Sequence, residues 1–293
     1  MAERINPAHQ YESPLRIVDP SKRKDFRNIE TFRGSVDKLI SVIGLGINKI
    51  ETGSQTEKEA TTLFYRTYEL IKMTVEEKID VDRSKKGHTE TAIGAIRLAT
   101  DLAIACDLKD KNARGIFGEF KGLVETTKLK SMLKKRLEES PDFRITPEHP
   151  AEADLEIAQN LVTQTGGKDI LVIGIGHRGI RRSLDIFLDY RTETDTPSSV
   201  FWPVRFSVNR GDRIYPNISW QEVDDLKKIA TDKTVVIIGP AERLEGTVEH
   251  LKQIMPKGEK AIGIALPVQQ RKKNEAHTSL LKRQSILRKT VGK

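Results

Sequence analysis

One stretch of the chain joins a buried-strand pattern to a run of residues suited to phosphate. Residues 169–175 are almost all apolar, and three glycines, a histidine and an arginine follow or overlap their end. Glycines leave backbone N–H groups unobstructed by a Cβ, and a helix expected over 180–190 would present its positive end to an anion. We therefore predict a phosphate-binding loop at 174–179. Its candidate ligands are Gly174, Gly176, His177, Arg178 and Gly179.

The same glycines also match the Gly-x-Gly-x-x-Gly fingerprint of dinucleotide-binding proteins. In those proteins an acid at the end of the second strand binds the ribose, and Glu193 or Asp195 stands near the required distance. Both acids precede the strand expected over 199–206, whereas the fingerprint needs an acid that ends it. A nicotinamide site is the weaker alternative for this segment.

A second set of basic residues lies on and after that strand. These residues are Arg205, Arg210 and Arg213, and Tyr215 follows them. A basic loop here would clamp pyrophosphate in a transition state, or it would contact a nucleic-acid backbone with Tyr215 or Trp202 as a stacking surface. Arg205 is a candidate for ligand binding, and Arg213 is a candidate for catalysis.

The elements expected around these residues divide the chain into two halves. Residues 28–145 show helical periodicity, with Val36, Leu39 and Ile43 on the first apolar face, a helix capped by Ser54, another from Thr89, and a basic helix over 122–139. Prolines 141, 147 and 150 mark a boundary at 140–149. Residues 1–27 are expected to form an extended arm.

After the boundary, strands alternate with helices, which is typical of a parallel α/β sheet. We expect helices over 151–165, 180–190, 220–230 and 247–255, and strands over 169–175, 199–206, 234–238 and 261–266. The predicted fold is α/β: a doubly wound parallel sheet at 150–268, preceded by an all-helical domain at 28–145 and followed by a basic tail at 269–293. Ligands of such sheets bind beyond the carboxyl ends of the strands.

Residues 150–268 resemble the type I phosphoribosyltransferase fold. The resemblance implies that 174–179 holds the pyrophosphate of phosphoribosyl pyrophosphate and that 207–216 is a mobile loop over the site. It also implies that 235–247, a strand followed by a short loop ending in Thr247, is the family's ribose-phosphate motif. Gly246 keeps that loop compact, and Gly246 and Thr247 are candidate ligands.

This sequence departs from the family motif at the residues that matter most for catalysis. Gly239 and Pro240 replace the paired acids that hold the ribose and the metal, and Leu244-Glu245 replaces the phosphate-binding Thr-Gly. A carboxylate next to a phosphate costs about 1–4 kcal/mol at ~4 Å. Standard phosphoribosyl transfer is therefore expected to be lost or altered, unless Glu242 and Glu245 replace the missing pair and bind Mg²⁺.

The net charge of +8 is concentrated at the C-terminal end of the chain. Between 271 and 293, eight basic residues face the single acid Glu275, which gives +7. Such a tail binds polyanions, nucleic acid among them, either as a disordered arm or as an amphipathic helix. Its candidate residues are Arg271, Lys272, Lys273, Lys282, Arg283, Arg288 and Lys289.

Composition excludes several other classes of protein. The apolar runs are too short to span a bilayer, the histidines show no metal-ligand spacing, and the single cysteine, Cys106, is expected to be a buried apolar residue. No metal site or resident cofactor is expected, and a reducing, cytoplasmic setting fits best. The leading hypothesis is a non-enzymatic binder of a phosphorylated small molecule or nucleotide that also engages nucleic acid. The alternatives are an active Mg²⁺-dependent phosphoribosyl or glycosyl transferase, and a scaffold in which the helical half forms a homo-oligomer.

Overall fold

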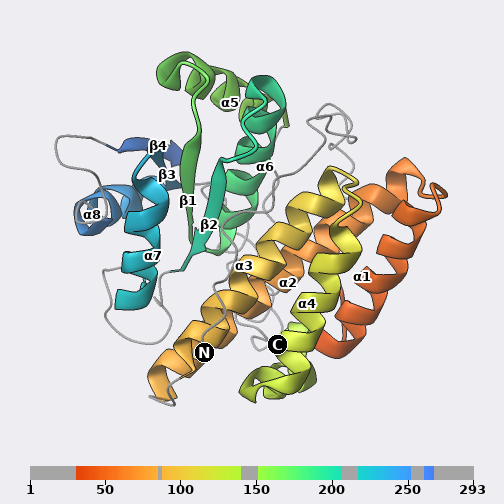
Figure 1. Ribbon diagram of the computed structural model, residues 1–293. Coiled ribbons are helices and arrows are strands. Elements are labelled where there is room, and N and C mark those ends of the chain that lie inside the picture. Colours follow the sequence, from red (N-terminus) through yellow and green to blue (C-terminus); the bar gives the residue numbers. More distant parts are fainter. Residues whose placement is uncertain (1–30, 85–87, 140–150, 206–216, 252–260, 267–293) are drawn as a thin grey trace, which may run out of the picture.

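The computed structural model describes residues 31–84, 88–139, 151–205, 217–251 and 261–266 of the 293-residue chain. A group of helices comes first, and a sheet whose strands alternate with helices follows (Figure 1). The predicted arm, the predicted boundary at 140–149 and the basic tail lie outside the described residues. No helix in the described ranges is long and apolar enough to cross a membrane.

The first helices pack through the apolar faces that their periodicity predicts. Helix α1 (Val36–Glu51) buries Val36, Leu39, Ile40, Ile43 and Ile47, and the Ser35 hydroxyl accepts the Lys38 N–H at its start. Helix α3 (Thr89–Asp107) begins at the predicted residue. It packs along helix α2 (Glu57–Ser84), which runs through the middle of the molecule (Figure 1).

The start of α2 differs from the prediction that Ser54 caps it. The Thr56 hydroxyl accepts the Glu59 N–H, and the Glu59 carboxylate accepts the Thr56 N–H at 2.9 Å. This reciprocal pair is a capping box, which satisfies two backbone donors at once. Ser54 instead lies 2.7 Å from the Thr52 hydroxyl, before the helix.

The predicted helix over 122–139 is also wrong. Helix α4 spans Ala113–Thr126, and two 3₁₀ helices follow it: η2 (Lys128–Lys134) and η3 (Leu137–Glu139). Thr127 is extended, and its hydroxyl accepts the Leu129 N–H. Leu129 and Met132 are buried, and their spacing of three residues matches the period of a 3₁₀ helix.

The sheet confirms the predicted doubly wound parallel architecture. Its strands are β1 (Ile170–Ile175), β2 (Val200–Val204), β3 (Thr234–Pro240) and β4 (Ile262–Leu266), and all pairs are parallel in the order β2-β1-β3-β4. Strand β1 is buried at every residue. That burial on both faces explains its unbroken apolar sequence.

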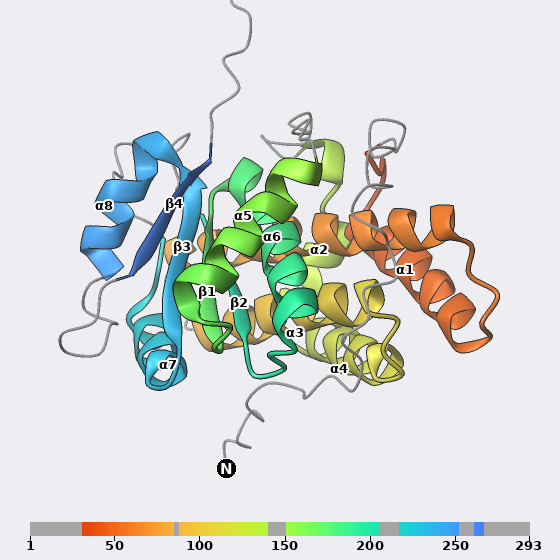
Figure 2. The same ribbon diagram turned by 90° about the horizontal axis from the view of Figure 1, so that it is seen from above.

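Helices cover both faces of the sheet (Figure 2). On one face, α5 (Ala151–Thr165) and α6 (His177–Thr194) pack on residues such as Val172. On the other, α7 (Trp220–Ala230) and α8 (Ala241–Leu251) pack on residues such as Leu171 and Ile173. Alternate residues of β1 therefore face opposite layers.

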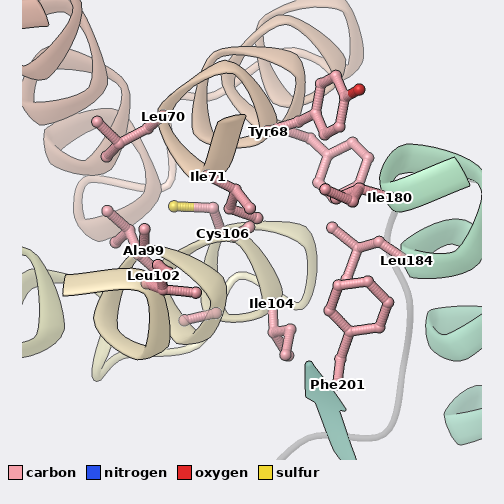
Figure 3. Packing of buried hydrophobic residues seen from close by; sticks show 14 of the residues in the cluster. Tyr68, Leu70, Ile71, Ala99, Leu102, Ile104, Cys106, Ile180, Leu184 and Phe201 are labelled. Carbon is pink, nitrogen blue, oxygen red and sulfur yellow. The ribbon is translucent and has the colours of Figure 1, made fainter. Parts of the chain in front are cut away.

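The helical half and the sheet half share one hydrophobic core (Figure 3). Tyr68 of α2 lies beside Ile180 and Leu184 of α6, and Phe201 of β2 packs against the same helix. Helix α6 is enclosed between the sheet and α2, which is why it is buried almost throughout. Cys106 is 2% exposed, and burial raises the pKa of its thiol, which confirms that it is an unreactive core residue.

Candidate functional site

The strand order creates a switch point between β1 and β3. The chain leaves β1 toward β2 on one side of the sheet, and it returns past β1 to form β3 on the other side. In open parallel sheets, ligands bind beyond the carboxyl ends of the strands at such a point. The two junctions that meet there are β1–α6 and β3–α8.

A single residue, Gly176, forms the β1–α6 junction. Its φ of +76° lies in the region that favours glycine, and its N–H donates to the Val204 carbonyl at 2.8 Å, which fixes the turn to the end of β2. The predicted loop at 174–179 is therefore wrong as a loop. Gly174 belongs to β1, and His177, Arg178 and Gly179 form the first turn of α6.

The N-cap residue of α6 is Gly176, which has no side chain that could cap the helix start. The first regular helical bond there runs from the Ile180 N–H to the Gly176 carbonyl, at 2.8 Å. The N–H groups of residues 177–179 precede that bond and carry the positive end of the helix dipole. The side chains of His177 and Arg178 lie outside the described part of the chain.

The start of α8 lies next to the start of α6. A Cβ built on Gly179 would lie 3.6 Å from the Gly239 Cα and 3.6 Å from the Pro240 Cδ, and α8 begins directly after Pro240. The first turn of α6 is thus in van der Waals contact with the last two residues of β3, from which α8 begins. The positive ends of both helices therefore border the switch point.

Packing explains two of the site's glycines. A Cβ on Gly174 would lie 2.2 Å from the Ser183 Oγ and 2.8 Å from the Phe201 Cζ. A Cβ on Gly239 would lie 2.7 Å from the Ile175 Cβ. Both residues are glycine because helix and strands approach closely, so neither needs a ligand to account for it.

A helix stands where the resemblance implies a ribose-phosphate loop. We expected a helix over 247–255, but α8 begins at Ala241 and includes Glu242, Glu245, Gly246 and Thr247. Glu245 is exposed, Thr247 is fully buried and turned away from solvent, and the Glu242 side chain is not described. The strand therefore runs straight into a helix at this junction.

Arg205, predicted to bind ligand, already has an acidic partner. Its Nη1 lies 3.0 Å from the Glu76 Oε1 of α2, and both side chains are nearly buried. The Arg205 carbonyl accepts the Asn217 N–H at 2.8 Å, so the residues that flank 206–216 are held together. Because Glu76 already neutralises part of its charge, Arg205 would attract an anionic ligand at this edge less strongly than a free arginine would.

Lys78 of α2 fixes the start of α7 to the same region. Its Nζ donates to the Asn217 carbonyl at 2.8 Å and to the Asn217 Oδ1 at 2.9 Å, and it pairs with Glu222 and with Asp82. Glu222 also completes a capping box with Ser219. Apart from Ser-x-x-Glu at 219–222, the sequence carries no signal for this cluster, because its partners are distant in the chain.

The chain was compared with protein-family models, with curated proteins and with solved structures. None of the three comparisons finds a match. The function of the chain is therefore inferred from the geometry of the switch point.

The arginines that follow the glycine turn have structural roles. The Arg181 guanidinium lies 5.5 Å from the centre of the Tyr65 ring, and Arg182 pairs with Asp154 of α5. Burial raises the pKa of the Asp154 carboxyl to about 6, although Arg182 opposes the shift. Both arginines face neighbouring helices of the protein.

The dinucleotide alternative does not fit the structure. Glu193 lies in the last turn of α6 and Asp195 is its left-handed C-cap. Because α6 has 18 residues, its last turn is ~27 Å from Gly176. That turn therefore lies far from the carboxyl ends of the strands, where the ribose would bind. The residue that follows β2 is the cation Arg205, and no ribose-binding acid stands there.

The remaining candidates are either buried away from the site or outside the described residues. Trp202 is 2% exposed beneath the Arg97 guanidinium, so it offers no stacking surface. Arg210, Arg213, Tyr215 and the tail cations lie outside the described residues. Among the described residues, no group of three or more metal-type side chains is found.

Proposed function

We propose that the protein binds a phosphate-bearing small molecule, such as a nucleotide or sugar phosphate, at the junction of β1 and β3. The observation that carries this proposal is that two helices, α6 and α8, begin at the switch point, with the glycine turn at Gly176 as its centre. Backbone N–H groups at a helix start, together with the helix dipole, favour a phosphate. In the same stretch of sequence, Arg178 adds positive charge and His177 adds an imidazole that can donate a hydrogen bond to phosphate.

We further propose that this is a phosphoribosyltransferase-like site that does not perform standard phosphoribosyl transfer. Support comes from Gly239 and Pro240, which replace the paired acids of the family motif. It also comes from α8, which replaces the short loop that would surround a 5′-phosphate. Such a protein keeps a phosphate site and lacks the groups that activate the ribose. The basic tail would engage an anionic macromolecule, with nucleic acid as the proposed partner.

Calorimetric titration tests the small-molecule part of the proposal. The ligands are phosphoribosyl pyrophosphate, nucleoside mono-, di- and triphosphates, and inorganic phosphate, at low salt. We expect at least one organic phosphate to bind more tightly than inorganic phosphate. The absence of binding by every one of them would refute the proposal.

The second candidate is an active Mg²⁺-dependent transferase, and the spacing of two acids favours it. Glu242 and Glu245 lie three residues apart in α8 and so share one side of the helix. Release of pyrophosphate from phosphoribosyl pyrophosphate in the presence of candidate bases, abolished in Glu242→Gln or Glu245→Gln, would support it. Glu249→Gln, one turn further along the helix, is the matched control.

A further inference from the structure

The 3₁₀ helix η2 carries a group of exposed lysines on the folded part of the protein. Lys128, Lys130 and Lys134 are exposed, and none of them forms an ion pair with any residue in the described ranges. Between residues 126 and 136 the sequence has five cations and no acid. The three lysines are called the η2 lysines below.

The protein holds η2 rigidly at both ends. Leu129 and Met132 are buried in the core, and the Thr127 hydroxyl caps the start. At the other end, Lys135 Nζ lies 2.6 Å from the Glu77 Oε2 and 2.8 Å from the Asp80 Oδ2. The η2 lysines are therefore presented from a fixed backbone.

The period of the 3₁₀ helix determines how these side chains are arranged. With three residues per turn, Lys128, Ser131 and Lys134 lie on one side, while Leu129 and Met132 lie on the buried side. A rise of about 2 Å per residue separates the Cα atoms of Lys128 and Lys134 by ~12 Å. Lys130 lies on the remaining side, also exposed.

This surface offers charge with little apolar area, since Leu133, on the side of Lys130, is partly buried against the core. Helices that bind membranes or fill protein grooves expose apolar side chains next to their cations, but the apolar residues Leu129 and Met132 of η2 face the core. The nearby acids are already paired: Glu125 lies 3.7 Å from Lys121, and Glu77 and Asp80 hold Lys135. Because no nearby acid among the described residues competes for them, these lysines are available to pair with the phosphates of a nucleic-acid backbone.

We propose that the η2 lysines form a contact surface for the nucleic-acid backbone, separate from the switch point and from the basic tail. The surface would contact backbone phosphates and would not distinguish one base sequence from another. Its binding does not depend on a phosphorylated small molecule, so the proposal stands or fails independently of the site between β1 and β3.

The test compares two triple variants of the full chain by fluorescence anisotropy, with labelled RNA and DNA oligonucleotides over a series of salt concentrations. One variant is Lys128→Gln, Lys130→Gln, Lys134→Gln. The matched control is Lys38→Gln, Lys58→Gln, Lys168→Gln, which removes three exposed lysines elsewhere. We expect the first variant to reduce the slope of log K against log salt by about 2–3, at 0.7–0.9 for each phosphate contact, and the control to leave the slope within about 0.5.

Three outcomes would overturn the proposal. The first is an unchanged slope in the η2 variant. The second is an equal reduction in both variants, which would make the effect one of net charge. The third is stronger binding, lost in the η2 variant, to polyglutamate or to phosphatidylserine vesicles, which would assign the surface to an acidic protein or a membrane. Thermal unfolding of both variants shows whether the η2 lysines serve instead to stabilise the end of α4, in which case stability falls and the slope does not.

Discussion

Lys78 of α2 and Asn217, which precedes α7, are joined by two hydrogen bonds across 139 positions of the chain. Together with the ion pair between Glu76 and Arg205, they hold the residues on both sides of 206–216 against one helix. The helical half is therefore part of the structure that forms the carboxyl edge of the sheet. The candidate site depends on both halves.

The first prediction concerns that buried lysine. Lys78→Met leaves the carboxylate of Glu222, which is 2% exposed, without its cation. Breaking a buried pair in this way costs about 3–5 kcal/mol, measured as the free energy of unfolding in urea. Lys227→Met, on the exposed side of α7, should cost less than about 1 kcal/mol. A similar small loss in both variants would show that Lys78 does not hold α7.

The second prediction concerns the close contact between β1 and α6. Gly174→Ala places a methyl group against Ser183 and Phe201 and should destabilise the protein by about 1–3 kcal/mol. Adding Ser183→Ala should restore part of the loss. Gly118→Ala, on the open side of α4, should instead stabilise by about 0.5–1 kcal/mol. Gly174→Ala with the stability of the original chain would mean that the contact is not tight.

The third prediction is a pH dependence of stability caused by Asp154. Burial raises the pKa of its carboxyl to about 6 in the folded protein, above about 3.9 for an unfolded chain. Between pH 4 and 6 the folded state therefore holds the proton more strongly than the unfolded state. The contribution of Asp154 is present below about pH 4 and is lost as pH rises to about 6.

Asp154→Asn isolates this effect, because Arg182, Arg181 and Asp185, which interact with the carboxyl, stay in place. Relative to that variant, the original chain should lose about 1–3 kcal/mol of unfolding free energy from pH 4 to pH 6. The measurement is urea unfolding at half-unit pH steps. Parallel curves for the two proteins would contradict the assignment.

The fourth prediction concerns the basic tail. Deleting 271–293 removes seven proposed phosphate contacts and should lower the slope of log K against log salt for nucleic acid by about 5–6. The η2 lysines should account for most of the slope that remains. A truncated chain with the full slope would place the binding elsewhere in the protein.

Local signals predicted much of the fold from the sequence. The bounds of α5 and α7 match the expected residues, since a proline boundary precedes one helix and Ser219 caps the other. The strands were recognised because β1 and β3 are apolar without alternation. These features depend on neighbours along the chain.

The starts of α6 and α8 could not be predicted in the same way. Each helix follows its strand with at most one residue between them, and no polar side chain caps α6 at Gly176. A glycine-rich stretch between apolar runs indicates a loop when only local patterns are considered. Close packing of Gly179 on Gly239 decides the outcome, and that contact joins helix α6 to strand β3.

The surroundings of the candidate site were predicted in part. Gly176 lies at the carboxyl end of β1, as expected, but Arg205 and Asn217 are held by Glu76 and Lys78 of α2, outside the half that carries the resemblance. Ion pairs between distant segments leave no periodic pattern in a sequence. The packing of Tyr68 against α6 likewise could not be predicted, because it also joins distant segments.

One substitution tests the phosphate site at the switch point most directly. Arg178→Asp puts a negative charge at the second residue of α6, where acids stabilise a helix but repel an anionic ligand. Lys58→Asp makes the same change at the second residue of α2. Calorimetry with the tightest-binding organic phosphate should show at least a tenfold weaker affinity for Arg178→Asp and an unchanged affinity for Lys58→Asp. Equal affinity in both variants would contradict the site between β1 and β3.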